Sequence, residues 1–442
     1  MMPTLERLLE LLARGPCSSR ELQGRLGVSQ STVSRLLRDA GKQVARLGQG
    51  RAVRYAGVRQ VFGLAESLPL YWVTASGQVE QVASLRALSG GRYLVEGGGL
   101  PFWLRGEAGT GLFDSLPYYL YDLRPSGFLG RQLARRAASE WGCPPDPRLW
   151  SDDHIGQYLV RRGDDLPGNL IVGEAAAERV NARTVDPAGA RRTAYPGLAE
   201  AACRDEAPGS SAAGEQPKFA VRHASAGPVI VKFSPRGTSE EAGRWRDLLR
   251  AEYHALVSVS KTGIAASAAT LHDLGGRLFL EVRRFDRQGP WGRLPALSLT
   301  MVDAEFAGQG ERWSKVAQAL RARELLDDRS WRAIRWLETF GTWIGNTDMH
   351  LGNLSLSPVA EGFRLLPVYD MLPMALAPVR GEVPRPSVRP PLRTLENREL
   401  WGAAGEAAAA YWSSVADDGR CSMKFRELAR ALRLQTERAL RD

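Results

Sequence analysis

One short stretch constrains this 442-residue chain more than any other: residues 345–356, which read Gly-Asn-Thr-Asp-Met-His-Leu-Gly-Asn-Leu-Ser-Leu. Within it Asp348 and Asn353 form a D-x-x-x-x-N pattern, and Asp370 follows in the sequence Pro-Val-Tyr-Asp. A phosphoryl-transfer enzyme needs a base for the attacking hydroxyl and oxygen ligands for Mg²⁺. We interpret Asp348 as a candidate base, and Asn353 and Asp370 as candidate magnesium ligands. The alternative is that these are turn residues, because Asn and Asp are common in turns.

A predicted hairpin explains how Asn353 and Asp370 could meet. Residues 354–357 are expected to form a strand, 358–362 a turn and 363–368 a returning strand. The two ends of a hairpin lie close together, so Asp370 is expected beside Asn353. Such a site suits Mg²⁺, which takes few protein ligands and leaves room for phosphate oxygens.

Length and composition indicate a cytoplasmic protein of two or three domains. No apolar run reaches membrane-spanning length, and the N-terminus has neither the apolar core nor the cleavage site of a signal peptide. The four cysteines are scattered without a C-x-x-C pair, which indicates neither a disulfide framework nor a zinc site. The net charge of +10 favours an anionic partner and not a particular fold.

Residues 1–56 are predicted to form a winged helix. Leucines at helical spacing define a first helix, which Gly15 stops. Ser18 and Glu21 have the form of a capping box for a second helix, and Ser29 can cap a third. A small hairpin with strands at 44–47 and 51–55 follows.

The exposed face of the third helix and the hairpin carry polar and basic side chains of the kinds that contact DNA bases and phosphates. The predicted DNA contacts are Gln30, Ser31, Thr32, Ser34, Arg35 and Arg38 on the helix, and Arg46, Arg51 and Arg54 on the hairpin. The alternative is a protein-interaction module of three helices that never meets DNA.

Residues 57–200 read as an α+β subdomain that packs against the next one. Strands are expected at 68–73 and 93–95, and a helix at about 130–138. No segment of this region carries chemistry by itself.

The small-residue stretch 208–218 leads into a predicted strand at 219–222, and a second strand follows at 229–233. A loop of small residues before a hairpin lets backbone N–H groups approach phosphates, and a plain surface linker is the alternative. In the second strand, Lys232 needs an anionic partner, because burying an unpaired charge is costly. Glu252, at a buried position of the helix predicted at 239–260, can supply it.

A Lys–Glu pair of this kind positions ATP phosphates in kinases, and a structural ion pair is the alternative. Residues 278–286 read as a buried strand that runs into a hinge between two lobes. Backbone groups of a hinge usually hold the adenine edge, which indicates Arg283 and Phe285. The C-terminal lobe is predicted to be helical, with helices at 320–326, 330–340, 398–416 and 422–440. His350 is expected to line the nucleotide site and not to act as a base.

Taken in order, these residues resemble the HipA-type serine/threonine kinases, the toxins of bacterial toxin–antitoxin pairs. The matching motifs are S-x-x-G-x-Q-x-K at 211–218, Val-Lys at 231–232, Glu252, Arg-Phe-Asp-Arg at 284–287, Asn-Thr-Asp at 346–348 with Asn353, and Tyr-Asp at 369–370. The winged helix together with residues 113–130 is similar to the YjjJ branch of that family. The resemblance implies an α+β fold with two kinase-like lobes, preceded here by the winged helix.

The resemblance also implies roles: Asp348 as catalytic base, Asn353 and Asp370 as Mg²⁺ ligands, and Lys232 on the phosphates of ATP. It places a nucleotide-covering loop at Ala213, Gly214, Glu215, Gln216, Pro217 and Lys218, and an inhibitory autophosphorylation site at Ser211. This chain departs from the family in two respects. The family usually has Glu at the hinge position of Arg283, and its DNA-binding part is normally a separate antitoxin of a different helix-turn-helix type.

We therefore expect a kinase that transfers phosphate from ATP to a serine or threonine of a protein substrate, with DNA binding in the same chain. A separate antitoxin is a candidate partner. The expected domains are 1–56, 57–200, 201–290 and 291–442. One alternative is a transcription regulator whose kinase-like domain only senses a nucleotide or ligand. Another is a small-molecule kinase, which would share every catalytic residue. The intact Asp348 argues against the sensor, because a sensor needs no base.

Overall fold

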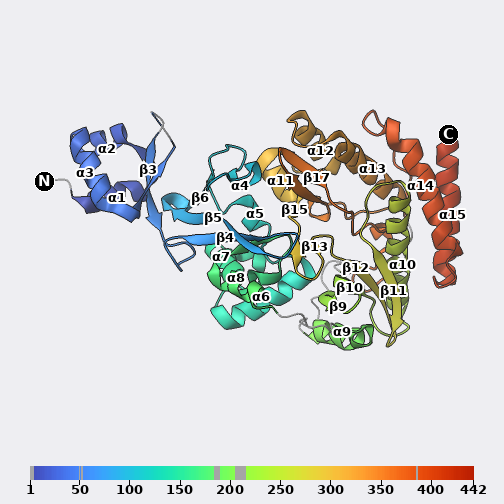
Figure 1. Cartoon of the computed structure of the whole chain (residues 1–442). Helices are drawn as coiled ribbons and strands as arrows, with labels where there is room; N and C mark the ends of the chain where they lie inside the picture. Colours follow the sequence, from blue (N-terminus) through green and yellow to red (C-terminus); the bar gives the residue numbers. More distant parts are fainter. Residues whose placement is uncertain (1–3, 49, 51–52, 184–189, 205–215, 385–386) are drawn as a thin grey trace. The chain divides into compact units, whose positions relative to one another are not determined.

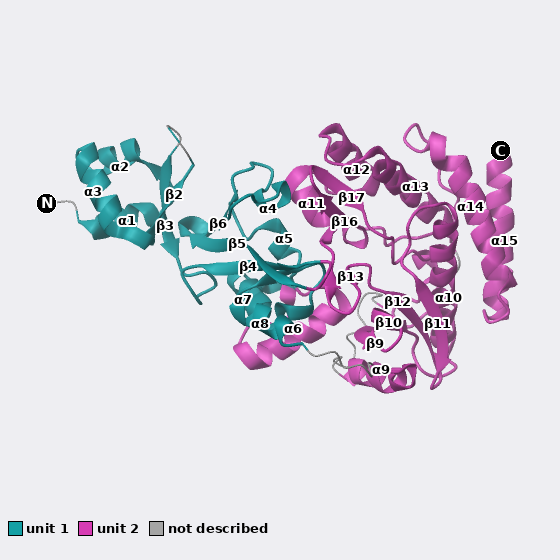
Figure 2. Cartoon of the chain, viewed as in Figure 1, with its two compact units in different colours: residues 1–74, 78–124, 148–183 teal, residues 75–77, 125–147, 184–442 magenta. Residues whose placement is uncertain are grey.

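The computed structural model describes residues 4–48, 50, 53–183, 190–204, 216–384 and 387–442 (Figure 1). The chain divides into two compact units (Figure 2). Unit 1 comprises residues 1–74, 78–124 and 148–183, and unit 2 comprises residues 75–77, 125–147 and 184–442. Among the described helices, none combines the length and the apolar character needed to span a membrane.

Unit 1 begins with three helices and a hairpin, in the order predicted for a winged helix. As predicted, Ser18 and Glu21 form a reciprocal capping box, and Ser29 caps the third helix. Buried side chains of all three helices, including Leu12, Leu22 and Val33, share one core. The elements are α1 (Leu5–Ala13), α2 (Ser19–Leu26), α3 (Gln30–Ala40), β2 (Val44–Leu47) and β3 (Arg54–Arg59).

The second hairpin strand ends later than predicted, because β3 continues beyond its pairing with β2 and then pairs with β5 in the same sheet. The sheet of unit 1 has the order β1-β3-β5-β4-β8, with β2, β6 and β7 branching from it. Helix α8 packs on it through Ala176 and Ala177, against Val73 and Ile171. The further elements are β1 (Cys17–Ser18), β4 (Leu68–Val73), β5 (Val79–Leu88), β6 (Tyr93–Glu96), β7 (Leu112–Phe113), β8 (Leu170–Val172), α4 (Phe102–Arg105), α5 (Tyr118–Tyr121), α7 (Asp152–Arg162) and α8 (Glu174–Asn181).

Unit 2 contains a four-stranded antiparallel sheet that forms its small lobe. The strands lie in the order β11-β12-β10-β9. Lys232 pairs with Leu280, and Val231 pairs with Glu281. Because directly paired residues project from the same face and neighbours alternate, Lys232 and Glu281 lie on opposite faces of the sheet. The strands are β9 (Lys218–His223), β10 (Gly227–Phe233), β11 (Ala269–Leu274) and β12 (Arg277–Arg283).

Each face of this sheet is covered by helices. On the Lys232 face, Leu249 of α10 (Glu240–Lys261) packs against Leu278, Leu280 and Val282. On the opposite face, α6 (Gly127–Trp141) and α9 (Tyr195–Arg204) supply Phe128 and Tyr195 to a core with strand residues. The sequence analysis did not find α9, whose second residue is Pro196. Proline is tolerated there because the first turn of a helix needs no amide donor.

The large lobe of unit 2 is mostly helical. The predicted helix at 320–326 is wrong, because α12 spans Trp313–Ala322. Glu324 has a φ of 60°, a left-handed conformation that ends the helix, and Leu326 then forms a β-bridge with Phe363. The remaining elements are α11 (Leu299–Phe306), α13 (Asp328–Ile344), α14 (Arg398–Asp417), α15 (Met423–Arg441), β13 (Arg287–Gln288), β14 (Gly292–Arg293), β15 (Leu297–Ser298), β16 (Ser355–Val359) and β17 (Gly362–Leu365).

Candidate active site

Helix α13 delivers the chain into the segment that carries Asp348. The helix ends at Gly345, whose φ of 77° is left-handed. A Cβ at this position would lie 2.7 Å from Cγ2 of Val388. Glycine is therefore required both by the backbone conformation and by the close approach of Val388.

Asn346 joins the catalytic segment to the residues that follow the hairpin. Its buried Oδ1 accepts a hydrogen bond from the backbone N–H of Asp348 at 3.1 Å. Its Nδ2 donates to the carbonyl oxygen of Asp370 at 3.5 Å. Asn346 had no predicted role of its own, although an Asn two residues before Asp348 is typical of an Asx turn.

Asn353 closes the same loop from its other end. Its Nδ2 donates to the carbonyl oxygen of Asp348 at 2.7 Å. The amide nitrogen is thus used within the loop, and the amide oxygen is the atom that a cation would take. The carboxylate of Asp348 is exposed, so an incoming hydroxyl could reach it.

The predicted hairpin is present, formed by β16 and β17, and its turn is limited to residues 360–361 because Val359 pairs with Gly362. Tyr369 fastens the two ends together. Its Oη donates to the carbonyl oxygen of Gly352 at 3.1 Å and shares a hydrogen bond with Oγ of Ser355 at 2.9 Å. The residues next to Asn353 and Asp370 are therefore joined directly, as the hairpin predicted.

The structure brings Lys232, Glu252 and Asp370 into one cluster. The ammonium of Lys232 donates to Oε1 of Glu252 at 2.6 Å and also pairs with the carboxylate of Asp370. Asp370 has a φ of 53°, which is uncommon for a residue with a side chain and is a conformation found at functional sites. The cluster ties strand β10 and helix α10 of the small lobe to the segment that follows the catalytic hairpin.

The charges of this cluster are unequal, because one ammonium faces two carboxylates. Burial opposes the charge of Lys232, but Asp370 and Glu252 outweigh it and raise the lysine's pKa. Burial also opposes ionisation of Asp370, yet Lys232 and then Lys218 lower its pKa to about 2. The pKa of Glu252 is raised by burial, and the charge of Asp370 adds to this against the pull of Lys232. The two carboxylates therefore differ, because burial favours the neutral form of Glu252 while the lysines favour the charged form of Asp370.

Two further observations fit a nucleotide and a metal at this site. Oε2 of Glu252 and Nε2 of Gln216 are buried and lack a hydrogen-bond partner within the described part of the chain. Lys218 pairs with Lys232 across β9 and β10, so both side chains project from the same face. Within the described ranges, no three His, Cys, Asp or Glu side chains gather around a possible metal position.

The two predicted hinge residues, Arg283 and Phe285, lie in different surroundings. Phe285 stacks on Tyr369 with ring centroids 5.6 Å apart, which places it next to the catalytic hairpin. Arg283 is exposed and lies on the face opposite Lys232, since it pairs with Val229. Its backbone N–H donates to the carbonyl oxygen of Ala268 at 2.9 Å. The side chain of Arg283 is therefore not brought to the cluster.

His350 holds the shape of the catalytic loop. Its Nδ1 accepts a hydrogen bond from the backbone N–H of Gly352 at 3.1 Å. Its carbonyl oxygen accepts from Nε1 of Trp313 at 2.9 Å. The charge of His350 also contributes to the low pKa of Asp370, after burial and the charges and hydrogen bond of the two lysines.

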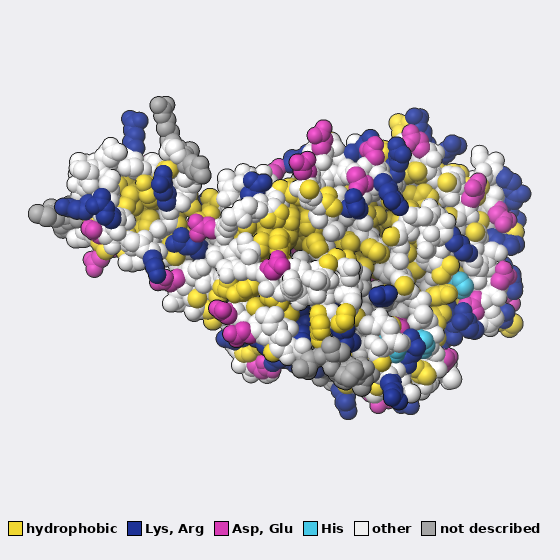
Figure 3. All heavy atoms as spheres, in the orientation of Figure 1, with side chains coloured by type: hydrophobic (Ala, Val, Ile, Leu, Met, Phe, Trp, Pro, Cys, Tyr) yellow, Lys and Arg dark blue, Asp and Glu magenta, His cyan; other side chains and the backbone are white. Residues whose placement is uncertain are grey.

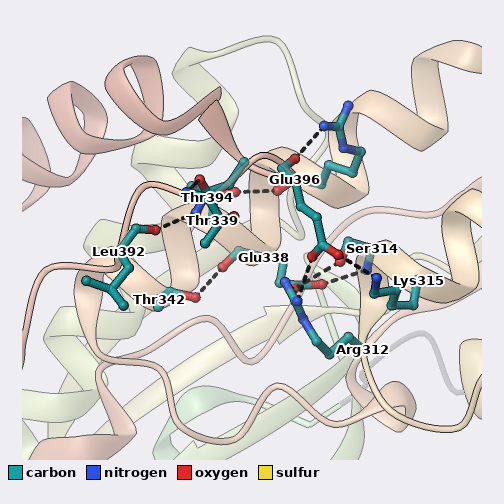
Figure 4. A network of polar contacts seen from close by, with 11 residues as sticks. Arg312, Ser314, Lys315, Glu338, Thr339, Thr342, Leu392, Thr394 and Glu396 are labelled. Carbon is teal, nitrogen blue, oxygen red and sulfur yellow. Dashed lines mark hydrogen bonds and ion pairs between the residues drawn. The ribbon is translucent and has the colours of Figure 1, made fainter. Parts of the chain in front are cut away.

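Trp313 is itself positioned by a polar network that the sequence analysis missed (Figure 4). Glu338 of α13 accepts hydrogen bonds from the backbone N–H of Ser314 at 2.6 Å and from Nε of Arg312 at 2.8 Å. A second acid, Glu396, pairs with Arg312 at 2.9 Å. These contacts fix the start of α12, and with it the indole that holds His350.

Several predicted residues do not belong to this cluster or cannot be placed. Ser211, Ala213, Gly214 and Glu215 of the predicted loop, and Arg51 of the hairpin, lie outside the described residues. In unit 1, Arg54 contacts the carbonyl oxygen of Pro16 at 2.7 Å and Glu21 at 3.3 Å. The remaining predicted DNA contacts are exposed, apart from the half-buried Thr32: Gln30, Ser31, Ser34, Arg35, Arg38 and Arg46.

Comparison with known proteins gives two family matches. Residues 64–181 match the middle domain of YjjJ-like toxins, and residues 210–440 match the HipA-like C-terminal domain. The chain is 36% identical over 437 residues to Toxin YjjJ of Escherichia coli K12, covering 97% of this chain and 96% of that protein. In fold it is similar to a toxin–antitoxin structure from Shewanella oneidensis MR-1 that contains HipA, HipB and operator DNA. That match has a TM-score of 0.58 at 13% identity, over 84% of this chain and 96% of the other.

Proposed function

The chain belongs to the YjjJ-like branch of the HipA family of toxins, and we propose that it is a cytoplasmic protein serine/threonine kinase that uses ATP and Mg²⁺. The observation that carries this proposal is the cluster of Lys232, Glu252 and Asp370. It joins a small-lobe strand, a small-lobe helix and the end of the catalytic hairpin, which are the parts that kinases bring together around nucleotide phosphates.

In this proposal the chain's own residues mainly position charge. Lys232 and Lys218 would hold phosphate oxygens, and the orphaned amide of Gln216 would donate to the nucleotide. Asn353 and Asp370 would hold Mg²⁺, which when bound supplies neutralisation of the phosphate charge. Asp348 would accept a hydrogen bond from the acceptor hydroxyl and take its proton, in a loop held by Asn346 and Asn353.

The acceptor is proposed to be a serine or threonine hydroxyl of a protein. Ser211 of the same chain would be one acceptor, as the family resemblance implies. The decisive experiment incubates purified full-length protein with radiolabelled ATP and Mg²⁺, alone and with cell extract. Label on the wild-type protein that disappears in Asp348→Asn and in Ser211→Ala is the expected result.

A matched control is Glu361→Gln, which removes an exposed carboxylate from the turn of the same hairpin and should keep full labelling. Transfer that persists in Asp348→Asn would refute Asp348 as the base. ATP binding without label on any protein would favour a nucleotide-sensing regulator. Label on a small molecule only would favour the small-molecule kinase.

We further propose that residues 1–56 bind DNA. The supporting observations are the exposed polar face of α3 and the basic side chains on the surface of the N-terminal region, dark blue at the left of Figure 3. The HipA relative was solved with HipB and operator DNA, and by analogy a separate antitoxin is a proposed partner here. Replacing both Arg35 and Arg38 by Ala should weaken binding to operator DNA in a gel shift. The exposed Arg7→Ala on α1 is the control, and equal loss in it would indicate non-specific charge attraction.

A further inference from the structure

Helix α10 carries two buried carboxylates that face in different directions. Glu252 faces the active site, where it pairs with Lys232. Asp247 stands five residues earlier, and at about 100° per residue the two side chains leave the helix roughly 140° apart. Helix α10 lies between the small-lobe sheet and α14 (Figure 1). A buried carboxylate needs partners, and those of Asp247 come from the connection between α14 and α15.

Ser422 begins α15 and holds Asp247 with two hydrogen bonds. Its backbone N–H donates to Oδ1 at 2.9 Å, and its hydroxyl donates to Oδ2 at 2.6 Å. The same hydroxyl oxygen caps α15 by accepting from the backbone N–H of Phe425 at 3.2 Å. Burial raises the pKa of Asp247, and the hydrogen bonds from Ser422 oppose that rise. One residue thus fastens α10 to the first turn of α15.

His254 makes a second contact about two turns further along the same side of α10. Its Nε2 shares a hydrogen bond with Oδ2 of Asp418 at 2.9 Å. Asp418 directly follows α14, and Nε of Arg420 donates to its Oδ1 at 2.8 Å. Hydrogen bonds from Arg420, and then from His254, hold the pKa of Asp418 well below its usual range, against the opposing effect of burial. The carboxylate is therefore charged and fixed where His254 meets it.

These two contacts stand on either side of Glu252 along the helix. On the sheet side, α10 packs through apolar side chains such as Leu249, and apolar burial is non-directional. Hydrogen bonds to a charged group have a defined geometry and therefore fix the rotation and the height of the helix. A rotation of α10 would withdraw the carboxylate of Glu252 from Lys232 and strand it in a buried site, which is costly.

We propose that Asp247 and His254 are positioning residues for the binding of the ATP phosphates. With their partners on the α14–α15 connection they hold α10 against the C-terminal helices, and so keep Glu252 on Lys232. Because they lie on the far side of the helix from Lys232, they act through the helix and not by contact with the nucleotide. This inference rests on the proposed kinase function and extends the support of the phosphate site to the C-terminal helices.

Ser422→Ala tests the inference, because Ser422 is exposed and its replacement should leave the protein folded. The change removes one hydrogen bond from Asp247 together with the side-chain cap of α15. Ser422→Thr keeps a hydroxyl and should behave as the wild type. Ser151→Ala is the matched control, since Ser151 is also an exposed serine that caps a helix, α7 of unit 1.

The first readout is hydrogen exchange of the backbone amides of α10 in the full-length protein. Ser422→Ala should speed this exchange roughly three- to tenfold, and His254→Ala, which removes the other contact, should speed it as well. Ser422→Thr and Ser151→Ala should leave the exchange of α10 as in the wild type. Unchanged exchange in both Ser422→Ala and His254→Ala would overturn the proposal.

The second readout is the affinity for a non-hydrolysable ATP analogue with Mg²⁺, measured by calorimetry in the wild-type and Glu252→Gln backgrounds. In the wild-type background Ser422→Ala should weaken binding roughly three- to tenfold. In the Glu252→Gln background it should weaken binding by less than about twofold, because the helix no longer has a carboxylate to position. Equal weakening in both backgrounds would show that Ser422 does not act through Glu252 and would overturn the proposal.

The two proposals fail in different ways. A wild-type protein that binds no analogue would overturn the proposed kinase and this role with it. A wild-type protein that binds, with an affinity that Ser422→Ala leaves unchanged, would overturn this inference alone.

Discussion

The side chains of Lys232 and Asp370 form an ion pair that joins a strand of the small lobe to the segment after the catalytic hairpin. The pair brings the proposed phosphate-binding cation into contact with a proposed metal ligand. The left-handed backbone of Asp370 shows that the surrounding structure holds this residue in place at some cost.

Removal of Lys232 should destabilise the fold strongly. Lys232→Met would leave the buried carboxylate of Glu252 without its cation, and breaking a buried pair in this way costs about 3–5 kcal/mol. Adding Glu252→Gln should restore part of the loss, because it removes the stranded charge. Urea unfolding measures both variants. The exposed pair of Arg321 and Asp328 supplies the control, since Arg321→Met should change stability by less than about 1 kcal/mol.

Asp370 should make stability depend on pH in the acidic range. Its pKa of about 2 in the folded protein is below the ordinary value of 3.8, so the ionised form stabilises the fold. This contribution, about 2 kcal/mol, is fully present above about pH 5 and is lost as the pH falls toward 2. The difference in unfolding free energy between wild type and Asp370→Asn should therefore shrink as the pH falls from about 5 to 2. A difference that stays constant would contradict the low pKa.

Asn346 should act on catalysis by positioning Asp348. Asn346→Ala would leave the backbone N–H of Asp348 without its acceptor and release the link to Asp370. Loss of these two hydrogen bonds should lower kcat roughly tenfold or more, with a smaller change in KM for ATP. Steady-state kinetics separates the two constants. Asn397→Ala is the control, because it also removes two hydrogen bonds of a half-buried Asn, to Thr394 and Leu392, away from Asp348. An Asn346→Ala effect confined to KM would argue for a role in nucleotide binding instead.

Glu338 should support the catalytic loop from a distance. Glu338→Ala would free Arg312 and the first turn of α12, and through Trp313 it would loosen the hold on His350. We expect a loss of about 1–3 kcal/mol in stability together with a lower kcat. Glu396→Ala removes the more exposed acid of the same network and should have a much smaller effect. Equal effects of the two variants would show that the network acts only on overall stability.

Much of this fold could be predicted from local patterns. The helix at 239–260 was recognisable from its apolar spacing and its capping serine, and the structure has it at Glu240–Lys261. The ion pair of Lys232 and Glu252 could be predicted from the sequence, because a charged side chain inside an apolar strand requires a partner of opposite charge. The helix at Tyr195–Arg204 was hidden by a proline and a glycine in its first turn. The end of α12 depends on the backbone of Glu324, which no side-chain pattern reveals.

The contacts that escaped prediction are those between residues distant in sequence. Arg192 and Glu281 pair across the back of the sheet, and Trp313 holds the carbonyl oxygen of His350. Neither contact has a signature in spacing or composition, because each depends on how whole elements pack.

The register of β10 against β12 has a consequence for how this protein can change. Since Lys232 and Val231 occupy opposite faces, inserting one residue into β10 ahead of Val231 would exchange what the two faces present. Such an insertion would move the lysine away from Glu252 and Asp370 and onto the face that α6 and α9 cover. We therefore expect a one-residue insertion inside β10 to abolish the cluster of Lys232, Glu252 and Asp370.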